Sequence, residues 1–238
     1  MDGGLVIVVG IDTSTPQPSV AIGTENEIIA KASVAGAARQ ESVTPLLHDL
    51  LRRSDLTLSQ IGGVAVGLGP GLFTGLRVGV ATAKTLAQVV NVPVVGIASL
   101  DALAYATRYS PRRIVAIIDA RRNEVFSAIY RAVPGGIVRE RDHEVHAPDR
   151  LAAELQSMRG EVLAVGNGAM LYRHVLEEVG SRIEFASSIA AHPEAAALVE
   201  LAVPRLLREE HDRLFDVVPL YLRKSDAEIA WDRRVRGL

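Results

Sequence analysis

Apolar residues along the chain follow two patterns that alternate regularly. Short runs rich in Val, Ile and Leu, such as residues 5–11 and 62–68, are typical of buried strands. Longer stretches repeat their apolar residues at helical spacing, as in residues 40–53 and 75–90, and predict helices with buried faces. The first part of the chain is therefore expected to form three strands and then helix, strand, helix, strand and helix. These elements span residues 5–11, 19–24, 28–34, 40–53, 62–68, 75–90, 92–97 and 99–108.

The rest of the chain repeats this order with almost no repetition of the residues themselves. Two of its strands read as a hairpin around Pro134, Gly135 and Gly136. The expected elements span residues 114–120, 125–133, 137–145, 148–158, 161–165, 169–179, 182–185 and 193–208. The repeated order predicts a duplicated α/β fold of the actin, Hsp70 and sugar-kinase type (the ASKHA fold), with two β-β-β-α-β-α-β-α lobes. The alternative is a single doubly wound sheet.

The duplicated reading divides the chain into two lobes. Residues 1–108 form the first lobe and residues 109–238 the second, whose C-terminal segment can return to the first. Asp12 and Asp119 each close the first strand of a lobe. Because α/β sheets usually bind ligands at the carboxyl ends of their strands, both carboxylates are expected to point into a cleft between the lobes.

Composition and charge exclude several classes of protein. The formal net charge of the 238 residues is −2, which argues against tight binding of nucleic acid by this chain alone. The absence of cysteine rules out disulfides and thiolate metal sites. No apolar run is long enough to cross a bilayer, and the N-terminus lacks the basic region of a signal peptide, so we expect a cytoplasmic protein without membrane contact. A basic tail at residues 233–236 is either a solvated terminus or a contact to nucleic acid within a complex.

A glycine-rich loop separates the strand at 62–68 from the helix at 75–90. Glycine lets the backbone approach another group closely, and the start of a helix favours an anion. One interpretation is therefore a loop that contacts a phosphate; the other is a tight turn that lets two elements pack. The spacing matches neither a P-loop nor the dinucleotide-binding fingerprint. The candidate nucleotide or anion contacts of the chain are Asp12, Gly69, Gly71, Thr74, Arg77, Asp119 and Arg121.

The turns after the two leading strands argue against catalysis by this chain. Kinases and ATPases of this fold need glycine-rich turns there, so that main-chain N–H groups reach the phosphates. Residues 12–18 and 119–124 contain no glycine, and two prolines remove donors from the first turn. We therefore expect no catalytic residues. We also expect no metal site, because His143 and His146 lie on a predicted strand, where their spacing directs them to opposite faces.

Several strings in the sequence resemble those of the TsaB (YeaZ) family. They are IDTST at 11–15, GPGLFTGLRVG at 69–79, SLDALA at 99–104, AIIDARRNEVF at 116–126 and PLYLR at 219–223. The resemblance implies a non-catalytic dimerisation subunit that works with a TsaD-like catalytic subunit and a TsaE-like ATPase to attach a threonylcarbamoyl group to the adenosine next to the anticodon in tRNA. It further implies that ATP or ADP and metal belong to the partner subunits or the interface, that tRNA is met only through the complex, and that the chain alone forms a homodimer.

The chain departs from the family pattern at one position. Family members often carry a histidine six residues ahead of a proline, and the position counted back from Pro45 is Arg39. The comparable helix of the catalytic paralogue holds a metal-binding HxxxH pair, which residues 39–44 lack. Metal at this place is therefore not expected.

The helix at 75–90 is apolar on most sides, so we expect one side to cover the sheet and another to meet a partner. Gly75, Gly79 and Ala83 form a stripe of small residues at a spacing of four, which lets another helix approach closely. The helix at 40–53 lies beside it. The expected interface residues are Val43, Leu47, His48, Leu50, Leu51, Gly75, Leu76, Gly79, Val80, Ala83 and Ala87. Two alternatives stay open: the stripe packs inside the chain, or the protein is a small-molecule kinase or ATPase that uses the cleft.

Overall fold

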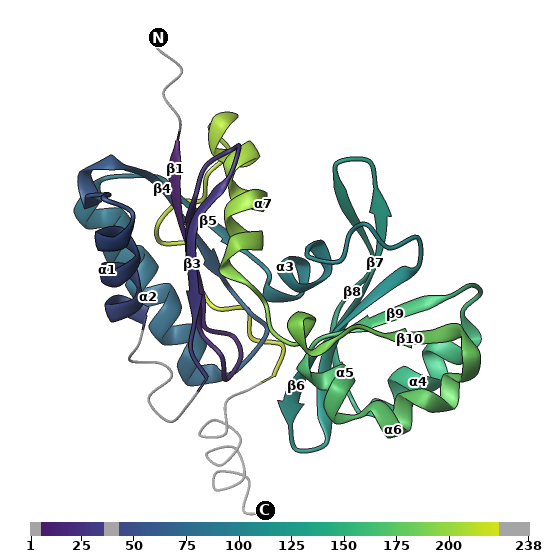
Figure 1. Ribbon diagram of the computed structural model, residues 1–238. Coiled ribbons are helices and arrows are strands. Elements are labelled where there is room, and N and C mark those ends of the chain that lie inside the picture. The colour runs from purple at the N-terminus through teal and green to yellow at the C-terminus, as the bar shows by residue number, and fades with distance from the viewer. Residues whose placement is uncertain (1–5, 36–42, 224–238) are drawn as a thin grey trace, which may run out of the picture.

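The computed structural model describes residues 6–35 and 43–223 and shows two lobes, each built on a five-stranded sheet (Figure 1). Arg39 and the basic tail therefore lie outside the described residues.

The first lobe begins with an antiparallel meander and continues with parallel strands. Strands β1 (Ile7–Asp12), β2 (Ser19–Gly23) and β3 (Ile28–Ser33) pair antiparallel, while β4 (Ile61–Gly67) joins β1 and β5 (Val94–Ile97) joins β4 in parallel. The order across the sheet is β3-β2-β1-β4-β5. The helices of this lobe are α1 (Val43–Arg53), α2 (Phe73–Val90) and α3 (Ser99–Tyr105), with a 3₁₀ turn at Leu58–Gln60.

The second lobe repeats this topology strand for strand. Its sheet has the order β8-β7-β6-β9-β10. Counted within each lobe, both sheets therefore have their strands in the order third, second, first, fourth, fifth. Its strands are β6 (Arg113–Arg121), β7 (Glu124–Val133), β8 (Gly136–His146), β9 (Val162–Val165) and β10 (Ile183–Phe185). Its helices are α4 (Pro148–Ser157), α5 (Asn167–Leu171), α6 (Arg173–Leu176) and 3₁₀ turns at Glu177–Arg182 and Ser188–Ala190. The duplicated fold is confirmed, and the alternative of a single doubly wound sheet is wrong.

The last helix, α7 (Ala195–Leu207), follows the second lobe in sequence but packs on the sheet of the first (Figure 1). Leu198 and Val199 of α7 are buried against Val8 and Val95 of that sheet. The segment after α7 stays with the first lobe, where the backbone N–H of Asp212 donates a 2.9 Å hydrogen bond to the carbonyl of Val94. The first lobe therefore has three layers, with α1 and α2 on one face of its sheet and α7 on the other.

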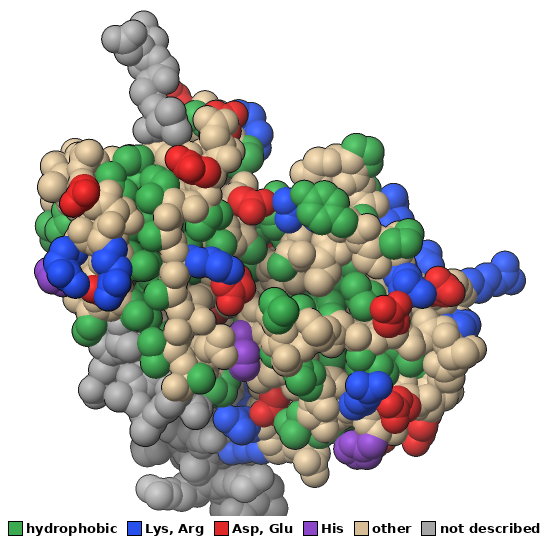
Figure 2. All heavy atoms as spheres, viewed as in Figure 1, with side chains coloured by type: hydrophobic (Ala, Val, Ile, Leu, Met, Phe, Trp, Pro, Cys, Tyr) green, Lys and Arg blue, Asp and Glu red, His purple; other side chains and the backbone are tan. Residues whose placement is uncertain are grey.

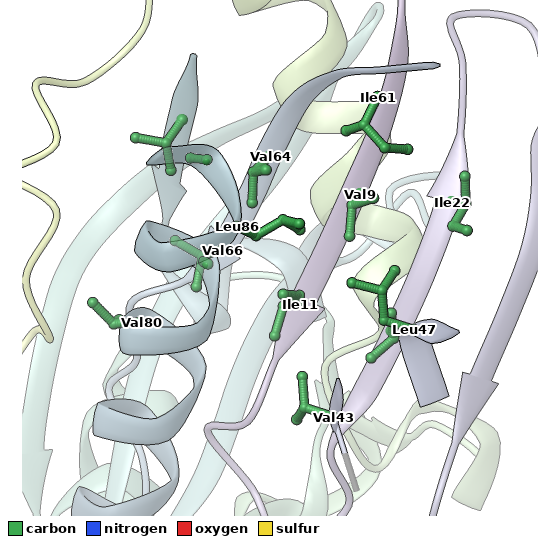
Figure 3. Packing of buried hydrophobic residues seen from close by; sticks show 14 of the residues in the cluster. Val9, Ile11, Ile22, Val43, Leu47, Ile61, Val64, Val66, Val80 and Leu86 are labelled. Carbon is green, nitrogen blue, oxygen red and sulfur yellow. The ribbon is translucent and has the colours of Figure 1, made fainter. Parts of the chain in front are cut away.

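The core between the first sheet and its two outer helices is built almost entirely of branched aliphatic residues. Figure 3 shows Val9 and Ile11 of β1 between Leu47 of α1 and Val80 and Leu86 of α2. Burial of apolar area at roughly 25 cal/mol per Å² makes this layer a main source of stability.

Several element boundaries differ by one to three residues from the sequence prediction, and one predicted helix is broken. Helix α2 begins at Phe73, two residues before the expected start, and α3 ends at Tyr105. The helix expected at 169–179 is broken, because Tyr172 takes φ −104° and ψ 23° between α5 and α6. Apolar periodicity continues through such a kink, so the pattern does not reveal it.

Candidate functional site

Asp12 ends β1 and is fully buried. Its Oδ1 accepts hydrogen bonds from the backbone N–H of Ser14 (2.9 Å) and the Ser14 hydroxyl (2.6 Å), and its Oδ2 accepts one from the Ser99 hydroxyl (2.7 Å). Gly67 passes so close that a Cβ there would lie 2.0 Å from Oδ2. Burial raises the pKa of Asp12, and this effect exceeds the opposing hydrogen bonds from Ser14 and Ser99. The carboxylate therefore accepts hydrogen bonds inside the first lobe and, contrary to the sequence prediction, does not point into an open cleft.

The glycine-rich loop lies directly on the turn after β1. The backbone N–H of Leu72 donates a 2.7 Å hydrogen bond to the carbonyl of Ser14, and a Cβ on Gly71 would lie only 2.2 Å from that oxygen. At the other end of the loop, the Ser99 N–H donates to the carbonyl of Gly69 (2.7 Å), which has φ +97°. Gly69 and Gly71 thus have a packing role that only glycine can fill.

Asp119 occupies the equivalent place at the end of β6 and is almost as well buried. Its Oδ1 accepts a 2.9 Å hydrogen bond from the backbone N–H of Arg121, and its Oδ2 lies 3.4 Å from the Arg121 guanidinium. The turn that follows holds Arg121, Arg122 and Asn123 at φ values of 65°, 56° and 56°. Three consecutive residues other than glycine in this region are conformationally costly, and such strain clusters at functional sites.

A cavity of about 310 Å³ lies between the lobes, at the start of α2 and beside this strained turn. Its walls are formed by residues 71–74 of the first lobe, residues 119–122 and Phe126 of the second, and residues 220–223. The start of α2 has no side-chain cap, and the N-terminal end of a helix favours a negatively charged group. The site thus combines a helix start with three arginines, Arg121, Arg122 and Arg223, which suits a negatively charged group.

The cavity brings together only part of the predicted set of anion contacts. Gly71, Thr74, Asp119 and Arg121 line it, whereas Asp12, Gly69 and Arg77 do not. Asp12 is enclosed by Ser14, Gly67 and Ser99, and Gly69 is hydrogen-bonded to Ser99.

Arg77 does not line the cavity itself but packs against two residues that do, Phe73 and Tyr221. Its guanidinium lies 3.9 Å from the centroid of the Phe73 ring, and its Nε donates a 3.1 Å hydrogen bond to the Tyr221 hydroxyl. The Phe73 and Tyr221 rings stack with centroids 4.8 Å apart. Sequence analysis did not include Tyr221 or Arg223 in the site, although both lie in the string PLYLR, which is the signal that could have revealed them.

The prediction that the small-residue stripe of α2 faces a partner is wrong. Gly75, Gly79 and Ala83 are buried inside the chain, and the Thr13 hydroxyl donates a 2.7 Å hydrogen bond to the carbonyl of Gly75. A Cβ on Gly79 would lie 2.1 Å from Thr13 Oγ1. The stripe lets α2 approach the chain's own β1–β2 turn.

All but one of the other expected interface residues are also buried inside the chain. Those buried in the chain's own core are Val43, Leu47, Leu50, Leu51, Leu76, Val80 and Ala87. His48 is exposed. The surface that α1 and α2 present to solvent is formed instead by Thr44, Pro45, His48 and Arg52 together with Arg77, Ala81, Thr85, Gln88 and Val89. Figure 2 shows charged side chains gathered over α1, where Asp49 pairs with Arg52 and Arg53.

The two histidines of β8 belong to separate networks. His143 Nε2 lies 3.2 Å from Asp101 Oδ1, whereas His146 Nε2 lies 2.9 Å from the Ser127 hydroxyl. Across residues 6–35 and 43–223, no three His, Cys, Asp or Glu side chains are grouped to hold a metal ion. Over the same ranges, no helix is both long and apolar enough to cross a membrane.

Two lobes of identical strand order place the chain in the class of duplicated, actin-like α/β proteins. Component A of the (R)-2-hydroxyglutaryl-CoA dehydratase of Acidaminococcus fermentans shares this fold, with a TM-score of 0.52, 13% identity and coverage of 85% of this chain and 99% of its own.

Closer relatives define the family. The family model described as TsaD, tRNA N6-adenosine threonylcarbamoyltransferase, matches residues 27–231. The tRNA threonylcarbamoyladenosine biosynthesis protein TsaB of Bacillus subtilis is 31% identical, with 94% of this chain and 97% of that protein covered; the Escherichia coli protein of the same name is 28% identical, with 95% and 97% covered. The solved structure of YeaZ from Pseudomonas aeruginosa superposes with a TM-score of 0.78 at 26% identity and covers 91% of this chain and 100% of its own. The chain belongs to this family, and within it to the TsaB (YeaZ) proteins.

Proposed function

We propose that this protein takes part in the biosynthesis of threonylcarbamoyladenosine in tRNA, in the cytoplasm, as a non-catalytic subunit. In this proposal a TsaD-like protein carries out the transfer and a TsaE-like ATPase assists. ATP or ADP and any metal belong to those partners or to the interface with them. The tRNA meets this chain only within the complex.

The observation that carries the non-catalytic role is the closed turn after β1. In kinases and ATPases of this fold, main-chain N–H groups of that turn face the phosphates. Here the backbone N–H of Ser14 donates to Asp12, and the carbonyl of Ser14 accepts from the N–H of Leu72. Gly71 lies so close to the Ser14 carbonyl that there is no room for a Cβ. A phosphate therefore cannot replace the glycine-rich loop at the backbone of Ser14 unless the loop first moves away.

The exposed surface of α1 and α2 is the partner surface that we propose. Arg77, Ala81 and Thr85 recur every fourth residue along α2 and are all exposed, so they form one continuous face. Near the end of the helix, the side chain of Val89 is 74% exposed. A partner that covered this apolar side chain would remove it from water. We propose that this face binds the TsaD-like subunit and, when the chain is alone, a second copy.

A charge placed on this face tests the proposal directly. Ala81→Arg leaves the core untouched, so we expect a normally folded chain that sediments as a monomer and no longer co-purifies with the TsaD-like protein. Ala153→Arg, at an exposed position of α4 in the other lobe, is the matched control and should still pair. Ala81→Arg pairing with unchanged affinity would rule this face out.

One observation favours the second candidate, a small-molecule kinase or ATPase. The cavity between the lobes unites the start of α2 with Arg121, which is a suitable environment for a phosphate. We propose that Gly71, Thr74, Asp119 and Arg121 contact a nucleotide or another anion there, on behalf of the complex. Calorimetry of the isolated chain with ATP and magnesium separates the candidates: micromolar binding with turnover supports the enzyme, and binding without turnover supports a site that serves the partner.

A further inference from the structure

Helix α3 is wedged between the two lobes (Figure 1). Its Ala102 is packed into the core of the first lobe, while Leu100 and Leu103 are packed into that of the second. Just beyond its end, Arg108 donates a 2.9 Å hydrogen bond to Glu200 of α7, which fastens this end of the wedge to the first lobe. Helix α3 is thus part of the core of both lobes.

Asp101 fastens the same helix to the second lobe. Its Oδ1 accepts a hydrogen bond from the Tyr130 hydroxyl of β7 (2.7 Å) and lies 3.2 Å from His143 Nε2 of β8. Arg139 of β8 donates to both carboxylate oxygens, at 2.9 and 2.7 Å. Bonds of this kind, between a charged donor and a charged acceptor, are stronger than hydrogen bonds between neutral groups. We call these four residues the Asp101 clasp.

Arg223 makes a second connection at a different place. The segment before it lies along the first lobe, where Leu220 N–H donates to the carbonyl of Leu68 (2.7 Å) and the Tyr221 hydroxyl accepts from Arg77 (3.1 Å). The Arg223 guanidinium then reaches the second lobe, donating to the carbonyl of Ala120 (2.9 Å) and pairing with Glu124. We call Arg223 with Ala120 and Glu124 the Arg223 clasp.

The two clasps hold opposite ends of β6. Tyr130 pairs with Ile114 near the beginning of that strand, whereas Glu124 pairs with Arg121 at its end. At about 3.3 Å per residue, the clasps are roughly 20 Å apart along the strand. Opening the cleft by about 10° around one clasp would move the other by roughly 3–4 Å, which is enough to break its hydrogen bonds.

We propose that these two clasps hold the lobes at one fixed angle, so that the cleft does not open and close when a nucleotide is offered. The two clasps together then form a rigid connection between the lobes. The proposal concerns the lobes themselves and does not depend on the identity of the partner.

Distance measurements between spin labels test the proposal. The chain has no cysteine, so Leu207→Cys on α7 and Ala153→Cys on α4, both exposed, provide the only two labelling sites, one in each lobe. We expect double electron–electron resonance on the full chain to give one narrow distance distribution that ATP with magnesium leaves unchanged. A second population, or a shift of about 3 Å or more on adding ATP and magnesium, would overturn the proposal.

Substitutions that release one clasp provide the second arm. Asp101→Ala and Arg223→Ala should each broaden the distribution, whereas Arg131→Ala, which removes an exposed ion pair with Glu140 inside the second lobe, should match the parent protein. Circular dichroism establishes that each variant is folded. Folded clasp variants that keep the parent distribution would overturn the proposal, and the comparison with and without ATP decides the matter even where a variant fails to fold.

Discussion

The hydroxyl of Thr13 donates a 2.7 Å hydrogen bond to the backbone carbonyl of Gly75, which joins the turn after β1 to the first turn of α2. This bond forms because Gly79, one turn further along α2, lets the helix approach Thr13 without a side chain between them. The glycines of α2 thus fix the position of the helix that carries the proposed partner surface.

Gly79→Ala tests this close approach. Its Cβ would lie 2.1 Å from Thr13 Oγ1, so the helix has to move, and we expect the free energy of unfolding to fall by about 1–3 kcal/mol. Urea denaturation measures the change. Gly136→Ala, where a Cβ meets open space, is the control and should be nearly neutral. Equal stabilities for the two variants would contradict the role of Gly79.

Gly71→Val tests the contact between the glycine-rich loop and the turn after β1. A Cβ would meet the carbonyl oxygen of Ser14 at 2.2 Å, and backbone atoms cannot move aside as a flexible side chain can. We expect a loss of about 1–3 kcal/mol and a lower thermal midpoint. An unchanged midpoint would mean that the loop tolerates displacement from Ser14.

Ala83→Arg should prevent folding, because Ala83 has no exposed surface and a buried guanidinium without a partner is very costly. Loss of the cooperative thermal transition is the expected result. Ala81→Arg, two positions earlier and exposed, should retain it. A folded Ala83→Arg variant would show that the stripe of α2 is more open than its burial indicates.

The purified chain should neither hydrolyse ATP nor transfer a threonylcarbamoyl group above background. In the turn after β1, both the backbone N–H and the hydroxyl of Ser14 donate to Asp12, and Asp12 also accepts from Ser99. Phosphate release after size-exclusion chromatography is the measurement. Turnover that persists through this step and is lost in Asp12→Ala would contradict the non-catalytic role.

The Asp101 clasp should give the protein an acid-sensitive contribution to stability. Burial disfavours the charged carboxylate, but hydrogen bonds from His143, Tyr130 and Arg139 together outweigh it and hold the pKa of Asp101 below its ordinary value. The unfolded chain therefore binds the proton more readily. The contribution is present above the ordinary aspartate pKa of about 4 and is lost as the pH falls through the lower folded value.

Asp101→Asn removes this contribution. We expect a loss of about 1–3 kcal/mol at pH 7, and a difference from the parent protein that shrinks as the pH falls below about 4. Urea denaturation at several pH values measures both. Arg205 lines a surface pocket together with Asp101, Tyr130 and Arg139, but it is paired with Asp212 and should not replace the lost bonds. A difference that is constant down to pH 3 would assign the loss to packing instead of charge.

Much of the fold could be predicted from the sequence because it depends on local patterns. Apolar runs and helical periodicity determine the order of strands and helices, and the same order twice over predicts two lobes. The positions of Asp12 and Asp119 at the ends of leading strands also follow from that order. The strings around the glycine-rich loop and residues 116–126 identify the family.

The tertiary structure alone decided which surfaces face inward. Helix α2 is apolar on most sides, so its sequence does not indicate that Gly75 and Gly79 meet Thr13 and Ala83 enters the core, while Ala81 and Thr85 face solvent. Periodicity gives the angle between residues on a helix but not the direction in which the helix is rotated against its neighbours. That direction is set by close packing with a turn more than sixty residues away in sequence.

The two clasps also depend on contacts that no local pattern contains. Arg223 meets Glu124 and Ala120 from about a hundred positions further along the chain, and Asp101 meets Arg139 across two strands and a hairpin. The sequence supplies arginines and carboxylates in many places, and only the folded backbone selects which of them come within hydrogen-bonding distance. The order of the elements was thus determined by the sequence pattern, whereas the closed turn, the inward stripe and the joined lobes arise from long-range packing.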